Sequence, residues 1–439
     1  MKHLFFAFLL VANFRIVDIF GQGSCPKMFI EAKYKRQYYP EGQDLSLQYS
    51  LIGLPVKALI EEDRYSESNG SGVFASQNIS NLRIQPALGP IYEAIRENDI
   101  ILLNERHNRP QHRALLYSIL DSLKALGINS VFLETLAYVN DDSLHHKENS
   151  IQSSGLYTRE SVYNQVCHKL KRLNYNVYSY EIGPLNQIDT QRIGKKLYLV
   201  NKADDKWQPI ETDSLILNKY FSKDDFIQRE AEQAIHIYQK IIRNHIGKAF
   251  IYCGYSHLFK SNDFMAGLLQ HLLRKPVFSI DQMYLNEHSD KKYENPLYIK
   301  FASTHSPFII TDSNNNIIHS MRHPIYKYVT DSLIDMAIGT PRTIYIHNRP
   351  TWLELGGDRI RCSLSKFIDV NKYQTDFLVT IYESEEYEKD KINAIPEDVF
   401  QVELHSKDYD VILTPNKKYR LFIIKDSQIL IDKIISSNE

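Results

Sequence analysis

Five short apolar runs, separated by segments of helical periodicity, constrain the fold of this chain more than its other features do. The runs span 100–103, 130–133, 176–180, 248–253 and 276–280. Between them, apolar residues recur three and four positions apart, as in helices that pack on a sheet through one face. Strands alternating with such helices favour βα repeats around a mostly parallel sheet. We therefore predict an α/β fold with flanking helices.

The helical segments carry their own boundary signals. We expect helices over 90–97, 111–126, 158–173, 222–244 and 263–273. Thr158 and Ser222 are residue types that cap helix N-termini. The stretch 185–221 is longer than the usual connection in such folds, which predicts an insertion or a lid.

The last third of the chain changes to a β pattern. A hairpin is expected over 309–319, around three successive Asn residues, with a helix over 326–336 after it. Further apolar or alternating runs follow at 377–382, 399–404, 411–413, 419–424 and 429–434. Their spacing predicts a small antiparallel, sandwich-like module.

The 439 residues exceed what one ordinary core accommodates. We predict the following division: a signal peptide (1–23), an irregular N-terminal segment (24–84), the α/β domain that carries the site (85–295), a mixed connecting region (296–369) and a β-rich module (370–439).

The N-terminus has the pattern of an export signal. Lys2 precedes an apolar run over 4–12, which is too short to span a membrane, and small residues offer cleavage near Gly23. We expect an exported protein, periplasmic or at the cell surface, without a transmembrane segment in the mature chain. Lipid anchoring at Cys25 is the less favoured alternative, because Gln22 replaces the aliphatic residue typical of that motif.

Composition excludes several classes of partner and site. Lys and Arg number 52 against 53 Asp and Glu, so no net positive charge attracts nucleic acid. The four cysteines show no C-x-x-C spacing, which indicates neither a disulfide framework nor a thiolate metal site. We expect a small-molecule or peptide substrate as the partner, and no nucleic acid.

An ionisable residue follows each of the five predicted strands. These residues are Glu105 with His107, Glu134, Glu181, His257 and Asp281. The carboxyl ends of parallel strands share one edge of a sheet, where ligands bind, so we expect these side chains to converge. His112 begins the next helix and can face the same edge. Polar residues are common after strands for structural reasons alone, but five in succession favour a site.

So many charged groups need neutralisation when they are buried together. A divalent cation held by His107, His257 and Glu105, a proton shared between carboxylates, or Arg229 reaching in from its helix would each supply it. A His and carboxylate set of this kind can activate water, with a carboxylate taking the proton.

Four motifs resemble a known superfamily. The stretch IILLNERHNRPQH (100–112) is similar to the LLGExHxxxxHH opening of the ChaN-like haem-uptake proteins, which belong with the erythromycin esterases and Tiki-type metalloproteases. VFLE (131–134), REA (229–231) and FIYCGYSH (250–257) are similar to its second strand, late helix and closing Gly-x-x-His. The resemblance covers residues 85–285. Asn104 and Arg113 depart from it, standing where the family has Gly and a second His.

The resemblance implies hydrolysis of ester or peptide bonds, in some members with a divalent metal, or haem binding in the ChaN-like branch. Glu105, His107, Glu134 and His257 would be catalytic, with His112, Glu181, Arg229 and Asp281 contacting substrate or supporting the site. The leading hypothesis is an exported hydrolase, an esterase or metallopeptidase. The alternatives are a binding protein for haem or another small ligand and a non-catalytic surface interaction protein.

Overall fold

The computed structural model describes the larger part of the chain. The described residues are 43–68, 81–134, 136, 154–181, 188–194, 196–201, 210–318, 333–403, 408–425 and 428–437. The predicted signal peptide, Cys25 and most of the predicted helix 326–336 lie outside them. Among the described helices, none combines the length and apolar character that crossing a membrane requires.

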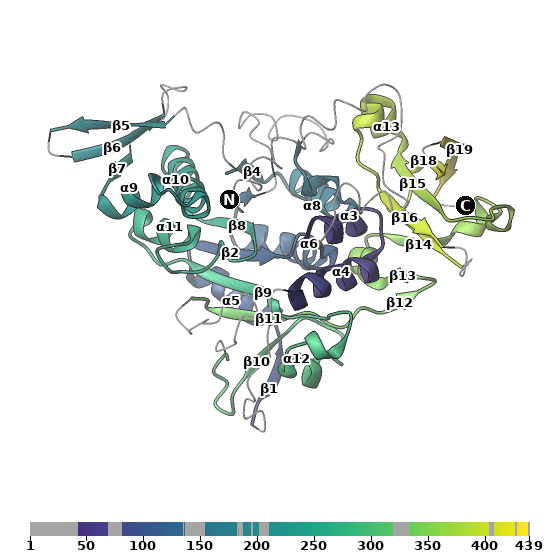
Figure 1. Ribbon diagram of the computed structural model, residues 1–439, viewed down its shortest axis with the longest axis horizontal. Helices are drawn as coiled ribbons and strands as arrows, with labels where there is room; N and C mark the ends of the chain where they lie inside the picture. Colours follow the sequence, from purple (N-terminus) through teal and green to yellow (C-terminus); the bar gives the residue numbers. More distant parts are fainter. Residues whose placement is uncertain are drawn as a thin grey trace.

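An eight-stranded sheet forms the centre of the protein (Figure 1). Its strands lie in the order β1-β10-β11-β9-β2-β8-β3-β4, and the pairs from β11 to β4 are parallel. Their bounds are β1 (Arg83–Pro86), β2 (Ile100–Glu105), β3 (Ser130–Leu133), β4 (Asn176–Ser179), β8 (Ala249–Gly254), β9 (Phe278–Leu285), β10 (Phe308–Thr311) and β11 (Met336–Gly339). The predicted α/β fold with a mostly parallel sheet is confirmed.

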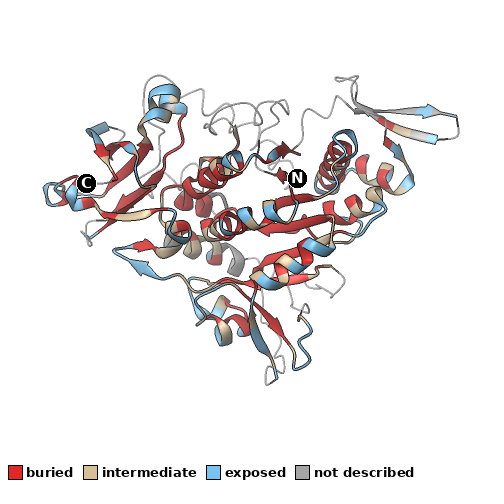
Figure 2. Ribbon diagram, turned by 180° about the vertical axis from the view of Figure 1, so that it is seen from behind, coloured by how far each residue is buried: buried red, intermediate tan, exposed pale blue. Residues whose placement is uncertain are grey.

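Helices cover both faces of this sheet because successive strand residues point to opposite sides. Ile101 and Leu103 of β2 belong to the core under α5 (Leu88–Glu97), α6 (Pro110–Ala125) and α8 (Ser161–Arg172). Ile100 and Leu102 belong to the core under α10 (Asp225–Arg243) and α11 (Met265–Leu273). Each fully buried aliphatic side chain stabilises the fold by about 1.5–3 kcal/mol. Figure 2 shows buried residues concentrated in the strands and the inner helix faces.

Two helices begin later than their predicted caps. Thr158 lies in a 3-10 turn, and Glu160 caps α8 by accepting hydrogen bonds from the amides of Val162 and Tyr163. Asp224 rather than Ser222 caps α10. In both cases a carboxylate further along the chain supplies the stronger, charged acceptor.

The stretch 185–221 contains an antiparallel sheet of its own. Its strands are β5 (Ile188–Ile193), β6 (Lys196–Asn201) and β7 (Ile210–Thr212), and α9 (Ser214–Tyr220) follows them. In Figure 1, β5 and β6 extend away from the central sheet. The predicted insertion is therefore present and folded.

The central sheet also recruits strands from the region predicted as a connection (296–369). β10 and β11 lie in that region and complete one edge of the sheet, with β1 paired to β10. Met336, expected to end a helix, begins β11, and the predicted hairpin partner Ile317 forms a single bridge with Thr311. Runs of four apolar residues are too short for periodicity to distinguish a strand from a helix.

The predicted β texture of the C-terminal region is confirmed. β15 (Phe377–Glu383), β16 (Asp398–Val402), β18 (Lys418–Lys425) and β19 (Gln428–Ser436) form an antiparallel sheet in the order β16-β15-β18-β19. β14 (Ile360–Ser363) pairs with β17 (Asp410–Leu413), and both contribute to the same apolar core as β15 and β18.

Part of the N-terminal segment expected to be irregular forms two helices instead. These are α3 (Gln43–Leu51) and α4 (Pro55–Ser68). Leu45 and Tyr49 of α3 pack in one apolar cluster with Leu378 and Phe422 of the C-terminal sheet. Because that contact is with residues over 300 positions away, the local pattern did not reveal it. In Figure 1, α3 and α4 lie between α6 and the C-terminal strands.

Candidate functional site

The carboxyl ends of β2, β3, β4 and β8 bring five of the predicted residues together. Nε2 of His107 lies 4.0 Å from Oε1 of Glu134, and Nε2 of His257 lies 3.4 Å from the same oxygen. Glu105 contacts His107, and Glu181 is joined to Glu134 through Arg229. This set defines the candidate site, and the catalytic roles of its members remain predictions.

Glu105 and Arg113 fix the imidazole of His107. Nδ1 of His107 lies 2.9 Å from Oε1 of Glu105, and Nε and Nη2 of Arg113 each donate to that carboxylate at 2.8 Å. Burial alone would raise the pKa of Glu105, but the Arg113 guanidinium outweighs it and lowers the pKa to about 2. An ionised Glu105 can only accept, so Nδ1 of His107 carries the proton of this contact, and Nε2 faces Glu134.

The ring of His107 is enclosed on several sides. Tyr157 stacks on it with ring centroids 3.8 Å apart, and Tyr255 meets it edge-on at 4.9 Å. A Cβ at Gly254 would lie 2.3 Å from Cε1 of His107, so this position admits no side chain without displacing the ring. The amide of Gly254 donates to Oε2 of Glu134. The Gly of the Gly-x-x-His motif is thus required by a close approach.

His257 is held between two carboxylates. Its Nδ1 lies 2.6 Å from Oε1 of Glu230, and its Nε2 faces Glu134. Burial lowers the pKa of His257, but Glu230 and Glu134 outweigh burial and raise it to about 10. Nε2 also lies 3.2 Å from Nη1 of Arg229. Because a protonated imidazole is repelled by a guanidinium, the contact with Glu134 is the favourable one of the two.

Arg229 stands at the outer side of the cluster. Its Nη2 donates to Oε1 of Glu134 and to Oε1 of Glu181, both at 2.9 Å. The Arg229 side chain is 33% exposed and that of Glu181 25%, whereas Glu134 is 6% exposed. Burial raises the pKa of Glu181, whereas His257, His107 and Arg229 outweigh burial at Glu134 and lower its pKa.

The predicted metal site of His107, His257 and Glu105 is not formed. Both Nδ1 atoms are engaged by carboxylates, and Glu105 is turned toward Arg113. Within the described ranges, no group of three or more His, Cys, Asp or Glu could hold a metal ion. The guanidinium of Arg229 takes the position beside Glu134 and His257 that a cation would need. The Nε2 atoms of His107 and His257 both face Glu134.

His112 and Asp281 do not join this cluster. His112 is fully buried on α6, where Nδ1 accepts from the amide of Arg106 and Nε2 lies 3.1 Å from Oδ1 of Asn286. Asp281 lies within β9 rather than after it, and its Oδ2 accepts from the amides of Met283 and Tyr284. Both side chains accept hydrogen bonds from backbone amides, so they stabilise the local backbone.

Three residues of the site were not predicted for it. Glu230 holds His257, Arg113 holds Glu105, and Tyr157 stacks on His107. Glu230 could have been predicted from the sequence, because it is adjacent to Arg229 on a helix expected to reach the site. Arg113 follows His107 by six residues and lies on α6, but it was noted only as a departure from the family motif. Tyr157 lies outside every motif.

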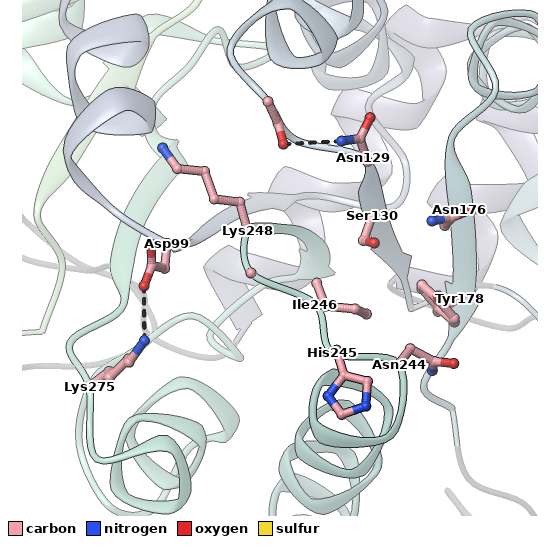
Figure 3. A pocket seen from close by; sticks show the side chains of 12 residues that line it. Asp99, Asn129, Ser130, Asn176, Tyr178, Asn244, His245, Ile246, Lys248 and Lys275 are labelled. Atoms are coloured by element: carbon pink, nitrogen blue, oxygen red, sulfur yellow. Dashed lines mark hydrogen bonds and ion pairs between the residues drawn. The ribbon is translucent and has the colours of Figure 1, made fainter.

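A hollow lies at the opposite edge of the sheet, at the amino ends of the strands. It has a volume of about 560 Å³ and is lined by polar residues that include Ser130, Asn176 and His245. Figure 3 shows that Lys275 and Asp99 pair across one side of it, with Nζ 3.1 Å from Oδ2. This hollow shares no residue with the cluster around Glu134.

Comparisons with known proteins give distant structural likeness only. No protein-family model and no curated protein matches the chain. A structure described as cofacial haem binding to ChaN of Campylobacter jejuni is 12% identical with a TM-score of 0.28, over 47% of this chain and 92% of that one. The type III effector HopBA1 is 11% identical with a TM-score of 0.28, over 47% and 88%. Likeness at this level assigns no activity.

Proposed function

We propose that this site is the acid–base centre of a hydrolase that cleaves an ester or amide bond. One observation carries the proposal: two imidazoles face a single carboxylate oxygen through their Nε2 atoms, at 4.0 and 3.4 Å. A separate buried carboxylate holds each Nδ1. Orienting partners of this kind fix the tautomer and the direction of a catalytic imidazole.

His107 is the general base of the proposed reaction. Its Nδ1 donates to Glu105, so the lone pair on Nε2 can accept a proton from a water molecule as that water attacks the carbonyl carbon. The ionised Glu105 stabilises the imidazolium that forms, and Arg113 keeps Glu105 in place through two hydrogen bonds.

His257 is the general acid. With its pKa raised to about 10, it is protonated at neutral pH and can give its Nε2 proton to the departing alcohol or amine. Arg229, partly exposed beside it, stabilises the negative charge that develops on the carbonyl oxygen. The products are a carboxylic acid and an alcohol or amine, and the two imidazoles return to their starting protonation states by exchange with solvent.

A variant series tests this function. Purified protein is assayed against chromogenic esters and a peptide library, with His107→Gln and His257→Gln as test variants and His305→Gln, at an exposed position outside the site, as control. We expect kcat/KM to fall by about 10²–10⁴ in the test variants, which circular dichroism should show to be folded. The unfolding midpoint should drop in His257→Gln, because Glu230 and Glu134 lose their charged partner. Wild-type turnover in His107→Gln would refute the assignment.

Haem titration separates the proposal from the binding alternative. A Soret shift that requires His107, in a protein that hydrolyses none of the substrates, would replace hydrolysis by haem binding as the function. A hydrolase without haem affinity shows no such shift.

We also propose that the protein is exported, on the pattern of residues 1–23. N-terminal sequencing of protein recovered outside the cytoplasm tests this. A mature chain that begins near Ser24 is the expected result.

A further inference from the structure

Glu62 of α4 lies at the centre of a buried group of polar contacts with the loop that carries His107. Oε1 of Glu62 accepts from Nη1 of Arg106. Oε2 accepts from Nδ2 of Asn108 at 3.0 Å and from Nε and Nη2 of Arg109 at 3.2 and 2.9 Å. The Glu62 side chain is 12% exposed. Burial raises the pKa of Glu62, but Arg106 and Arg109 outweigh it and lower the pKa well below its usual range.

The side chains of this loop divide between two partners. Arg106, Asn108 and Arg109 all bind Glu62, whereas His107 turns the other way and binds Glu105. The residues on both sides of His107 are thus held by one carboxylate of α4. Fixing both neighbours fixes the backbone from which the imidazole projects.

The next residue of α4 holds a second loop of the same sheet edge. Oδ1 of Asp63 lies 2.5 Å from Nδ1 of His288, and Oδ2 accepts from the amide and hydroxyl of Ser289 at 2.7 and 2.6 Å. These residues follow β9, the strand next to β2. α4 therefore joins the loops after two adjacent strands.

The other end of this helical pair is anchored on the C-terminal sheet. The amide of Gln401 in β16 donates to the carbonyl of Ile52 at 3.2 Å, and Leu45 packs against the sheet. Ser46 of α3 accepts from Asn108 at 2.6 Å, so α3 also contacts the loop. The C-terminal sheet, α3–α4 and the His107 loop form one continuous set of contacts.

We infer that Glu62 is a positioning residue for His107, and that α3–α4 transmits the support of the C-terminal sheet to the site. This inference rests on the proposed function for its effect on turnover. Its structural part stands independently, because the orientation of the His107 ring is measurable without a substrate. Removing the Glu62 charge leaves two buried guanidinium groups without their shared partner, and the loop must rearrange to solvate them.

The test compares Glu62→Gln with Glu61→Gln in the full chain. Glu61 is the preceding residue of α4 and pairs with the exposed Arg64 rather than with the loop. Imidazole nitrogen NMR reports the tautomer of His107, and steady-state kinetics report kcat and KM. In Glu62→Gln we expect the His107 signals to move toward those of exchanging tautomers and kcat to fall about 10- to 100-fold, with KM changed less than twofold. Glu61→Gln should match wild type in both readouts.

Two further variants keep the test decisive. Asn108→Ala removes the contacts with Ser46 and Glu62 without leaving a charge unpaired, so it should fold and shift the same signals by a smaller amount. Glu62→Asp should restore part of kcat by retaining the charge. Wild-type His107 signals in folded Glu62→Gln and Asn108→Ala would overturn the inference, whatever the loss of thermal stability. A wild-type protein without turnover would overturn the proposed function alone, because the NMR readout would still decide the role of Glu62.

Discussion

Oε1 of Glu230 lies 2.6 Å from Nδ1 of His257, on the opposite side of the ring from Glu134. Glu230 is fully buried and neighbours Arg229 in α10. One helical turn therefore supplies both the carboxylate at Nδ1 of His257 and the guanidinium near its Nε2. Replacing Glu230 tests whether that pairing controls the proton on His257.

Glu230→Gln should shift the pH dependence of turnover. Glu230 helps to raise the pKa of His257, so its loss lowers that pKa and moves the basic limb of the kcat profile to lower pH. We expect kcat at pH 8 to fall at least about tenfold. Glu232→Gln is the control on the same helix, since Glu232 contacts Gln228 rather than the site. An unmoved basic limb in Glu230→Gln would contradict His257 as the acid.

Stability should depend on the protonation of His257. Its folded-state pKa, about 10, is above the ordinary value of about 6.5, so the folded state binds the proton more tightly than the unfolded state does. The resulting stabilisation is fully present below pH 6.5 and is lost as pH rises through 10. Urea unfolding between pH 6.5 and 10 should show this decline, and it should be shallower in His257→Gln. Equal slopes in both proteins would show that other groups cause it.

Gly254→Ala should displace His107. The added Cβ would lie 2.3 Å from Cε1 and 2.5 Å from Nε2 of the imidazole, and 3.0 Å from Oε2 of Glu134. We expect kcat/KM to fall about 10²-fold because the proposed base is moved from its position. Gly89→Ala, whose Cβ meets nothing within 4 Å, should leave kinetics unchanged. Full turnover in Gly254→Ala would remove His107 from the mechanism.

Turnover should survive chelators, because Arg229 supplies the positive charge beside Glu134 and Glu181. Arg229→Ala should lower kcat about 10²–10³-fold, with Arg229→Lys intermediate, as expected for loss of a group that stabilises a developing oxyanion. The measurement is kcat with and without EDTA. Activity that EDTA abolishes and a divalent metal restores would instead establish a metal centre.

Gly53→Ala should destabilise the connection between α3 and α4. Gly53 has φ +67, and a Cβ there would lie 2.3 Å from the carbonyl oxygen of Val399. Gly53→Ala therefore combines a strained backbone conformation with a steric clash. Gly127 has φ +90 but open space around its Cβ position, so Gly127→Ala measures the backbone strain alone. Gly127→Ala should cost about 1–2 kcal/mol in the free energy of unfolding for backbone conformation alone, and Gly53→Ala should cost more. If both variants lose the same free energy of unfolding, the backbone around Gly53 accommodates the added methyl group without a steric cost.

Much of the site was predictable because parallel strands impose a simple rule. Residues that follow such strands lie at one edge of the sheet, so Glu105, His107, Glu134 and His257 could be expected to converge from their places in the sequence. Asp281 is the exception. β9 continues for four residues beyond it, so its side chain meets backbone amides instead of the site. A strand end read from apolar residues alone does not show where pairing stops.

The sequence by itself determined the α/β class, the succession along the chain of five of the central strands and their helices, and the identity of the imidazoles, because periodicity and strand-end position are local properties. Only the tertiary structure decided what neutralises the buried carboxylates and what supports the loop. Arg113, Glu230 and Glu62 reach their partners across gaps of 8, 27 and 44 residues, counted to Glu105, His257 and Arg106. Such pairings depend on which side chains the packed core leaves facing one another, and no local pattern encodes that.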